Sequence, residues 1–364
     1  MRKIVMYVYG NIQTDARVKR AANALARKYE LVLLSNDCGV EIKDEGYQNV
    51  LLKCASSGMK GYIQSVKEAL KVIKREKPDI FYAHDYYSAL IARLVLFHKY
   101  CKKIVYDAHE LIIPDNIHTN LRMSFFYQME QNIVHKVDLL VCASYERSKI
   151  MEKHYHLEKS PLVVENISYL PLDYDLSVLD FTNALNKFFE DSTPTLVYAG
   201  VVTKSRRLIE LLELVIQKAN SVKLLVVGKG DALEEMEKIA ASQKSLKCFF
   251  TGAVPYEALG AILSRCDVGY LYYPTDTLNN INCASNKIYE YASAGLPIVA
   301  NENPTIKRIL DNNGIGVASD NFDDALTQVL VSLEKFKKSC YTFVKSNSWD
   351  KTAQQLVEKV ESLY

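Results

Sequence analysis

The sequence predicts an α/β protein of two domains, each built on a doubly wound parallel sheet. Three observations favour this fold class. The chain has 364 residues, which corresponds to about two domains at roughly 150 residues each. Short, continuously apolar runs alternate with amphipathic stretches, as in parallel strands covered by helices on both faces. This rhythm stops near position 166 and starts again near position 194, which separates the two domains.

Strands and helices can be assigned in order along the first domain. Its apolar runs predict strands at 4–9, 31–35, 80–83, 104–106, 139–142 and 162–164. Helical spacing of apolar residues predicts helices at 15–29, 62–76, 86–99, 122–136 and 145–155. In the second domain, strands are expected at 196–198, 224–227, 248–251, 268–272, 298–300 and 315–317. After Phe322 the strand pattern ends, and helices are expected up to the C-terminus.

The break in the rhythm sets the domain boundaries. We expect an N-terminal domain at 1–170, a connector at 171–193 and a C-terminal domain at 194–345. The connector begins at Pro171, ends just before Pro194 and contains acidic residues and phenylalanines, which is unlike the flanking apolar runs. A last helix at 346–364 is predicted to pack back on the N-terminal domain.

Charge and composition exclude several classes of protein. The net charge of +2 is too balanced for a generic nucleic-acid binder, so no nucleic-acid partner is expected. Residues 1–166 carry a net +6 and the remainder a net −4, which leaves open a contact of the basic domain with a membrane surface. No secretion signal or membrane-spanning run is recognisable, and the eight cysteines form no CxxC pair. These features predict a cytoplasmic protein with reduced thiols, with the inner face of the membrane left open.

Two familiar ligand motifs are incomplete. A nicotinamide enzyme needs G-x-G-x-x-G after a strand, and Gly228-Lys229-Gly230 does not complete it. No P-loop is present. Asp173-Tyr174-Asp175 has the form D-x-D, but it lies in the expected connector rather than at a strand end. We therefore expect neither a dehydrogenase nor a metal site.

The most informative stretch is 285–299. Ser285 is positioned to cap a helix that begins at Asn286 and stops at Gly295. Lys287 in the first turn opposes the helix dipole, which a phosphate bound at the helix N-terminus would explain. Glu290 lies one turn further along the same face and could accept hydrogen bonds from ribose hydroxyls. The alternative is a solvated Lys–Glu pair on the surface.

This stretch resembles the C-terminal signature of retaining GT-B glycosyltransferases of glycosyltransferase family 4. Glu290 matches the second glutamate of that signature, whereas Asn282 stands where the family has the first. Further resemblances follow in order along the chain: Asp15–Ala22, Ile104–Leu111, Val163–Asn166, Tyr198–Gly200, Val227–Gly230, Thr251–Tyr256, Ala261–Asp267 and Ser348-Trp349. Arg206 stands at the family's lysine position, and Val201 replaces its arginine. The resemblance implies a GT-B architecture, with two Rossmann-like domains facing a cleft.

Positions after strands in the N-terminal domain are further candidates. His109 lies just past a strand, where Asp107 could orient it, and the resemblance implies a contact near the reacting centre. Gly10 and Asn11 permit close approach of an acceptor, or form a plain tight turn. His84 is a second candidate for acceptor contact, and its alternative is a loop histidine. Arg17 either solvates a helix face or meets an anionic acceptor.

The resemblance also implies the reaction and the remaining site. It implies transfer of a sugar, with retention, from a nucleotide-diphosphate-sugar donor to a glycan or lipid-linked acceptor. It requires no cofactor besides the donor substrate. His109, Lys287 and Arg206 are the expected catalytic residues. The expected nucleotide-sugar site is made up of Gly200, Gly228, Val254, Asn282, Ser285, Asn286 and Glu290.

Two alternatives remain open. The replacements at Asn282 and Val201 are compatible with an inactive GT-B protein that binds a ligand or partner. A nucleotide-sugar epimerase on the same fold is the other.

Overall fold

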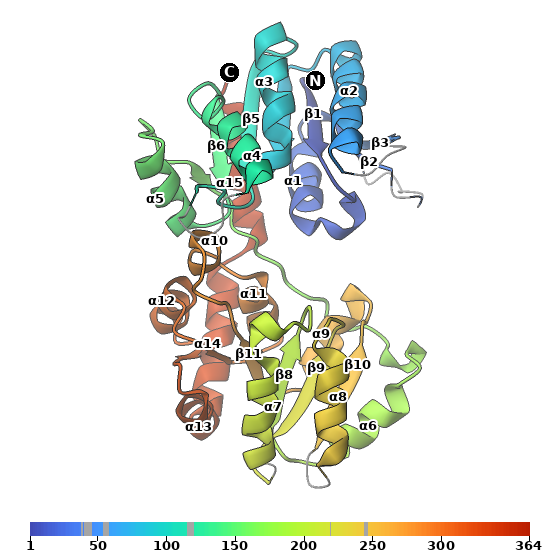
Figure 1. The fold of residues 1–364 in the computed structure, drawn as a ribbon, viewed down its shortest axis with the longest axis vertical. Helices are drawn as coiled ribbons and strands as arrows, with labels where there is room; N and C mark the ends of the chain where they lie inside the picture. The colour runs from blue at the N-terminus through green and yellow to red at the C-terminus, as the bar shows by residue number, and fades with distance from the viewer. Residues whose placement is uncertain (38, 40–45, 54–57, 115–119, 219, 244–246) are drawn as a thin grey trace. The chain divides into compact units, whose positions relative to one another are not determined.

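The computed structural model describes residues 1–364 except 38, 40–45, 54–57, 115–119, 219 and 244–246 (Figure 1). The chain divides into two compact units. The first contains residues 1–166, 277–279 and 349–364, and the second contains residues 167–276 and 280–348. Each unit is built on its own parallel sheet, which confirms the predicted fold class. No helix of the described residues is long and apolar enough to cross a membrane.

The first sheet has the strand order β3-β2-β1-β4-β5-β6-β7, and its neighbouring strands pair in parallel. The strands are β1 (Lys3–Val8), β2 (Glu30–Asn36), β3 (Gln48–Leu52), β4 (Ile80–His84), β5 (Lys103–Ala108), β6 (Leu139–Cys142) and β7 (Leu162–Val163). The order of strands along the chain reverses between β1 and β4. Ligands of such sheets bind at the carboxyl ends of strands beside this reversal, so the ends of β1 and β4 are the expected site.

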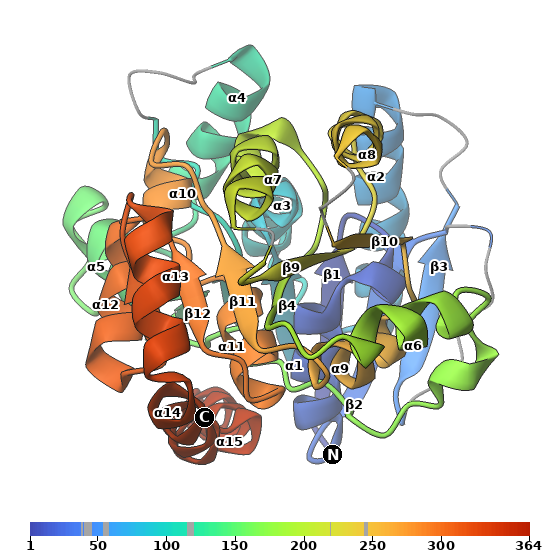
Figure 2. The same ribbon diagram turned by 90° about the horizontal axis from the view of Figure 1, so that it is seen from below.

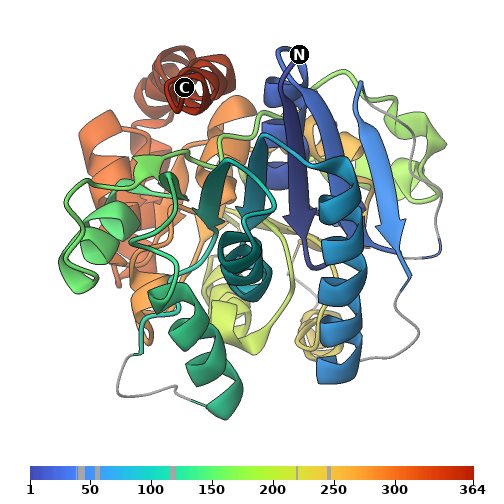
Figure 3. The same cartoon turned by 90° about the horizontal axis from the view of Figure 1, so that it is seen from above.

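Helices cover both faces of the first sheet (Figures 1 and 3). The two apolar layers alternate along each strand: in β1, Val5 and Tyr7 face one layer, and Ile4 and Met6 the other. The first layer contains α2 (Gly58–Glu76), α3 (Ala89–His98), α4 (Leu121–Gln131) and α5 (Tyr145–His154). The second contains α1 (Ala16–Ala26) and α15 (Trp349–Glu361), which pack against each other.

The second sheet has the strand order β10-β9-β8-β11-β12-β13, again with parallel pairing. The strands are β8 (Thr195–Ala199), β9 (Lys223–Val227), β10 (Cys248–Gly252), β11 (Val268–Leu271), β12 (Ile298–Ala300) and β13 (Gly316–Ala318). Here the reversal falls between β8 and β11, so a ligand is expected at their carboxyl ends.

Helices also lie on both faces of the second sheet (Figure 2). One face packs against α7 (Leu208–Gln217), α8 (Leu233–Ser242) and α13 (Phe322–Val331). The other meets α11 (Asn286–Ser293), whose Tyr291 hydroxyl accepts a hydrogen bond from the Ala199 amide at 3.0 Å. The remaining helices of this unit are α6 (Thr182–Glu190), α9 (Tyr256–Leu263), α10 (Leu278–Ile281, which begins in the first unit), α12 (Pro304–Asn313) and α14 (Leu333–Ser346).

Two regions differ from the expectations. The edge strand β3 was not predicted, because Gln48 and Asn49 interrupt its apolar run. Residues 171–193, expected as a connector, fall within the second unit. The ammonium of Lys223, which starts β9, donates to the Phe188 carbonyl at 2.8 Å and lies 4.7 Å from the Phe188 ring. This buried lysine therefore fastens α6 to the sheet.

Candidate active site

Two histidines and an aspartate gather at the carboxyl ends of β4 and β5 in the first unit. His84 ends β4, Asp107 lies in β5, and His109 follows one residue after that strand. His84 Nδ1 lies 3.2 Å from His109 Nε2 and 3.5 Å from an Asp107 carboxylate oxygen. Arg17 from α1 pairs with the same carboxylate, with 2.6 Å between Nη2 and Oδ1. Asp107 thus connects the two histidines to a buried arginine, as the sequence suggested for its link to His109.

The charges in this cluster are coupled through Asp107. Burial is the largest influence on Asp107 and opposes its charge, but the Arg17 guanidinium, His109 and His84 together outweigh burial and hold the pKa of Asp107 well below its usual range. Burial also opposes a charge on His109, yet the nearby Asp107 carboxylate raises the pKa of His109. For His84 burial prevails and lowers the pKa. His109, whose side chain is 15% exposed, is therefore the histidine equipped to hold a proton at the surface of the cluster.

The other candidates for acceptor binding in the first unit are Gly10, Asn11 and His84, and they differ in how far ligands can reach them. Gly10 follows β1 with a φ of 157°, and a Cβ there would meet nothing within 4 Å. The Asn11 side chain accepts a hydrogen bond from the Gln13 amide at 2.9 Å and so caps a short 3-10 helix. His84 is fully buried and stacks on Tyr82, with ring centroids 4.5 Å apart. The expectation that His84 contacts an acceptor directly does not agree with this structure, because its side chain has no exposed surface.

The cluster also has the composition of a metal site. The ligand atoms of His84, Asp107 and His109 lie within 4.8 Å of one another. However, Arg17 contacts both Asp107 oxygens, through Nη2 at 2.6 Å and Nε at 3.2 Å. A cation would have to share that carboxylate with a buried guanidinium, so the geometry favours an ion pair over a metal site.

In the second unit, the N-terminus of α11 carries the predicted lysine and glutamate. The Ser285 hydroxyl accepts a hydrogen bond from the Lys287 amide and caps the helix, as predicted. The Lys287 ammonium lies 2.6 Å from Glu290 Oε2, while the Tyr256 hydroxyl donates to Glu290 Oε1 at 3.2 Å. Glu290 thus supplies an internal anion for Lys287. The unfavourable position of Lys287 in the helix dipole consequently no longer requires a bound phosphate.

Arg206 is held beside the same helix N-terminus by a tyrosine. Its Nη1 donates to the Tyr272 carbonyl at 2.8 Å, and its guanidinium lies 3.8 Å from the centre of the Tyr273 ring. The Tyr273 hydroxyl in turn accepts a hydrogen bond from Ser285 at 3.2 Å. The loop after β11 therefore joins two predicted residues, Arg206 and Ser285. Tyr273 itself was missed, because a tyrosine after an apolar strand carries no distinctive spacing.

Glycines bring the strand-end loops of this unit close together. A Cβ on Gly228, after β9, would lie 1.8 Å from the Gly200 carbonyl oxygen, after β8. Gly200 has a φ of 150°, and a Cβ there would lie 3.6 Å from Lys287 Cε. Both positions therefore require glycine. Without side chains, the backbones of the two loops can approach each other, and Gly200 can lie close to Lys287.

The remaining predicted residues of the second unit lie on nearby loops. Asn282 is buried and precedes the Ser285 cap, and Asn286 is the first residue of α11. Val254 is half-buried in the loop between β10 and α9. These placements agree with a shared strand-end region but assign none of the three a contact with a ligand.

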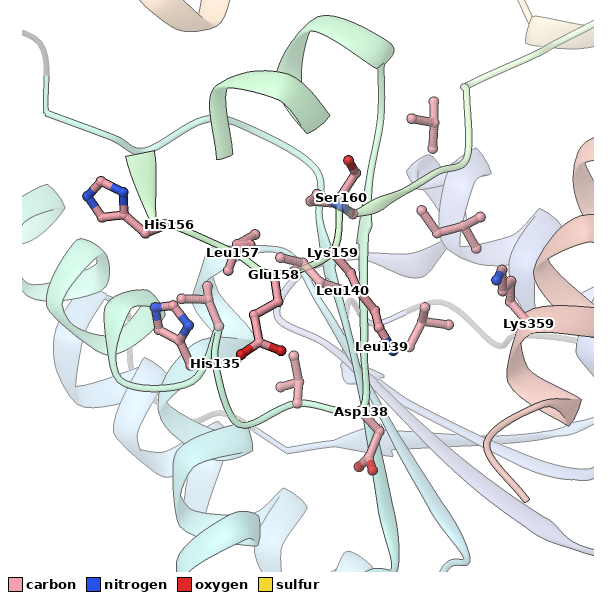
Figure 4. A pocket seen from close by; sticks show the side chains of 15 residues that line it. His135, Asp138, Leu139, Leu140, His156, Leu157, Glu158, Lys159, Ser160 and Lys359 are labelled. Carbon is pink, nitrogen blue, oxygen red and sulfur yellow. The ribbon is translucent and has the colours of Figure 1, made fainter. Parts of the chain in front are cut away.

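A cavity of about 890 Å³ in the first unit lies apart from these residues. It is lined by parts of 134–140 and 156–163 together with Lys359. Figure 4 shows His135, Glu158 and Lys359 around it, on separate segments. None of the predicted site residues lines this cavity, so we do not assign it to the reaction.

Comparison with protein families identifies both units. Residues 16–164 match the model of Glycosyltransferase Family 4, and residues 193–335 match that of Glycosyl transferases group 1. The chain belongs to these glycosyltransferases. The two matches cover one unit each, in the order that the sequence resemblance implied, and the expected transferase class is thereby confirmed.

Solved structures show that this glycosyltransferase has the GT-B fold. The sucrose-phosphate synthase of Thermosynechococcus elongatus is 15% identical with a TM-score of 0.73, over 100% of this chain and 99% of that one. Anabaena HepE, in complex with UDP and glucose, is 12% identical with a TM-score of 0.74, over 100% of both chains. WaaG, a glycosyltransferase involved in lipopolysaccharide biosynthesis, is 12% identical with a TM-score of 0.70, over 98% of both. Comparison with curated proteins gives no significant match.

Proposed function

We propose that this glycosyltransferase moves a sugar, with retention, from a nucleoside-diphosphate sugar to a hydroxyl of a glycan or lipid-linked acceptor. The observation that carries the proposal is the group around the N-terminus of α11. There Tyr273 connects Arg206 to Ser285, and the Ser285 hydroxyl accepts a hydrogen bond from the Lys287 amide. Lys287 in turn pairs with Glu290, and the group lies at the strand ends beside the sheet reversal. Backbone amides, an ammonium and a guanidinium are the groups that bind a diphosphate.

Each residue of this group receives a separate task in the proposal. Lys287 and Arg206 stabilise the charge that develops on the departing diphosphate, so no metal ion is required. Glu290 accepts a hydrogen bond from a ribose hydroxyl. A carboxylate oxygen has more than one acceptor site, so Glu290 can do this while it remains paired with Lys287. His109 acts at the reacting bond, where Asp107 keeps its imidazole oriented and readily protonated.

Nucleotide binding and sugar transfer in EDTA test this function. A nucleoside diphosphate at about 100 times its dissociation constant should stabilise the protein by roughly 2.7 kcal/mol, seen as a higher melting temperature. A screen with UDP, GDP and ADP identifies the base, and the corresponding nucleotide sugars are then supplied with glycan acceptors. Transfer that stops in EDTA and returns with Mn²⁺ would contradict the roles of Lys287 and Arg206.

An inactive GT-B binding protein is the second candidate. Two observations favour it: Asn282 replaces the first signature glutamate, and Val201, which is 66% exposed, replaces the family's arginine. It predicts stabilisation by a nucleoside diphosphate without consumption of any nucleotide sugar, whereas the transferase consumes its donor.

We further propose that the first unit contacts an anionic membrane surface. Met59 and Ile63 are 46% and 44% exposed and lie one turn apart on α2, among Lys60 and Lys67. Together with the net positive charge of residues 1–166, this face combines apolar and basic side chains. The protein should therefore sediment with phosphatidylglycerol vesicles and remain in solution with neutral phosphatidylcholine vesicles. Equal sedimentation with both would contradict the electrostatic part of this contact.

A further inference from the structure

Asp85, directly after β4, has a backbone conformation that is costly for any residue except glycine. Its φ is 63° and its ψ is 166°, a region that glycine alone occupies readily. Hydrogen bonds on both sides hold it there. Its amide donates to the Asp107 carbonyl at 2.8 Å, and its carbonyl accepts from the Ser88 amide at 2.9 Å and the Ser88 hydroxyl at 2.6 Å. These bonds would form equally well with glycine, so the strain results from having a side chain at this position.

The carboxylate of Asp85 is also poorly satisfied. Its Oδ1 is buried and has no hydrogen-bond partner among the described residues. Burial is the main cause that raises the pKa of this carboxyl to about 6, with the charge of Glu110 adding to it and that of His109 opposing it. The residue as a whole is half-buried, and the last torsion of aspartate is broad, so the carboxylate can turn toward a ligand. The carboxylate has a backbone hydrogen bond with Tyr86, which lowers its pKa but leaves Oδ1 unsatisfied. A buried oxygen without a partner, on a residue with a strained backbone, is better explained by a binding role than by a contribution to stability.

The surroundings of Asp85 specify what it could bind. It stands at the end of the strand beside the sheet reversal, within electrostatic reach of His109, Glu110 and Asp15. Arg17 does not contribute free positive charge here, because it is paired with Asp107. The acidic groups disfavour a phosphate at this corner and favour a neutral group that donates hydrogen bonds.

We propose that Asp85 accepts a hydrogen bond from the acceptor hydroxyl that receives the sugar, and that this hydroxyl belongs to a neutral sugar. The inference rests on the proposed function and deepens it. In the transfer, the acceptor oxygen bonds to the anomeric carbon as the bond from that carbon to the diphosphate breaks. The diphosphate leaves with the bonding electron pair, and the hydroxyl turns its one proton from Asp85 to a diphosphate oxygen, which takes it up as the bond breaks. Asp85 orients the hydroxyl and is not consumed.

Replacement of Asp85 by glycine and by asparagine separates the effect of the carboxylate on transfer from the effect of the strained backbone on stability. Asp85→Gly should raise the melting temperature, because the strain is removed while the backbone hydrogen bonds remain. The rise in melting temperature caused by UDP, or by whichever nucleoside diphosphate binds, should be unchanged. With methyl glycosides as acceptor probes, kcat/KM for the acceptor should fall at least thirtyfold in Asp85→Gly. It should fall less in Asp85→Asn, whose amide oxygen still accepts a hydrogen bond.

Lys99→Gly is the matched control. Lys99 is exposed at the end of α3 and also has a positive φ, of 53°. Its replacement should stabilise the protein and leave transfer unchanged. The inference is overturned if Asp85→Gly transfers sugar as well as wild type, if it is less stable than wild type, or if sugar 6-phosphates are better acceptors than neutral glycosides. A wild-type protein that consumes no nucleotide sugar would instead overturn the proposed function, and the inference with it.

Discussion

The pairing of Lys287 with Glu290 determines how substitution at either residue acts on stability. Glu290 has only 4% of its side chain exposed, and Lys287 has 24%. Removal of the lysine relieves an unfavourable interaction with the helix dipole, worth about 0.3–1 kcal/mol. It also leaves a nearly buried carboxylate without its cation, and loss of one partner of a fully buried pair costs about 3–5 kcal/mol. Because Lys287 is partly exposed, the net loss should be smaller than that.

We expect Lys287→Ala to lower the free energy of unfolding by about 1–2 kcal/mol. The same change should reduce turnover at saturating donor by about a hundredfold, since removal of one preorganised donor typically costs about 2.7–4 kcal/mol in the transition state. Urea unfolding and steady-state kinetics measure the two effects. The double variant Lys287→Met/Glu290→Gln is the control for stability, because it removes both charges. A Lys287→Ala protein more stable than wild type would show that the helix dipole dominates.

For single residues, sequence spacing predicted which side chains share a face of a helix, but it could not predict burial or backbone strain. The three-residue spacing of Lys287 and Glu290 correctly placed them on one helix face. Burial of His84 depends on the rings and strands around it, which spacing does not reveal. The strain at Asp85 was also invisible, because an aspartate after a strand is an ordinary residue in an ordinary place. Its φ and ψ follow from hydrogen bonds to Asp107 and Ser88.

Among the elements, α4 contributes a buried acid that joins three parts of the first unit. Glu130 of α4 accepts hydrogen bonds from Tyr106 of β5 at 2.5 Å and Tyr155, just after α5, at 2.6 Å. Burial raises the pKa of Glu130 to about 7, although both tyrosines act in the opposite direction. The folded state therefore binds this proton more tightly than the unfolded chain does. The resulting stabilisation is complete below the ordinary glutamate pKa and is lost as the pH rises through about 7.

Glu130→Gln should remove this pH dependence, because the amide is neutral throughout. At pH 8 the variant should be more stable than wild type by roughly 2–3 kcal/mol, and at pH 4 the two should be nearly equal. Urea unfolding at several pH values gives the difference between the two proteins, which cancels the titration of other groups. A difference that stays constant from pH 4 to pH 8 would contradict the raised pKa.

Strands in the interior of a sheet could be predicted from the sequence, whereas the edge strand β3 could not. Interior strands such as β4 and β9 are covered on both faces, so their residues are continuously apolar and were found. The edge strand β3 has Gln48 and Asn49 at its start, and the pattern there is too weak to predict a strand. Helix α6 lies in the segment that was expected as a connector. Its attachment through Lys223 depends on a contact between segments that a local pattern does not contain.

At the scale of the whole molecule, the first unit is assembled from both ends of the chain. Leu356 of α15 is fully buried in the apolar layer that α1 and the first sheet share. Truncation of such a leucine typically costs about 2–5 kcal/mol through lost burial and a residual cavity. The stability of the first unit should therefore depend on residues that are far from it in sequence.

We expect Leu356→Ala to lower the free energy of unfolding of the first unit by about 2–5 kcal/mol. The neighbouring exposed residue provides a control, since Gln355→Ala should change stability little. Hydrogen exchange resolved by segment reports on each unit, and protection should fall in α1 and β1 while it persists in β8 and β9. Equal loss of protection in both units would show that they unfold together.

The return of the chain to the first unit has a consequence for its biosynthesis. A ribosome delivers residues 1–166 before residues 167–348, yet α15, which belongs with the first group, is translated after both. Until it emerges, the apolar surface of α1 that it covers is exposed on the nascent chain. The second unit, whose residues are all available earlier, can complete its core first. The unit whose synthesis begins first is thus completed after the second unit, and a chaperone that shields α1 during translation would act in that interval.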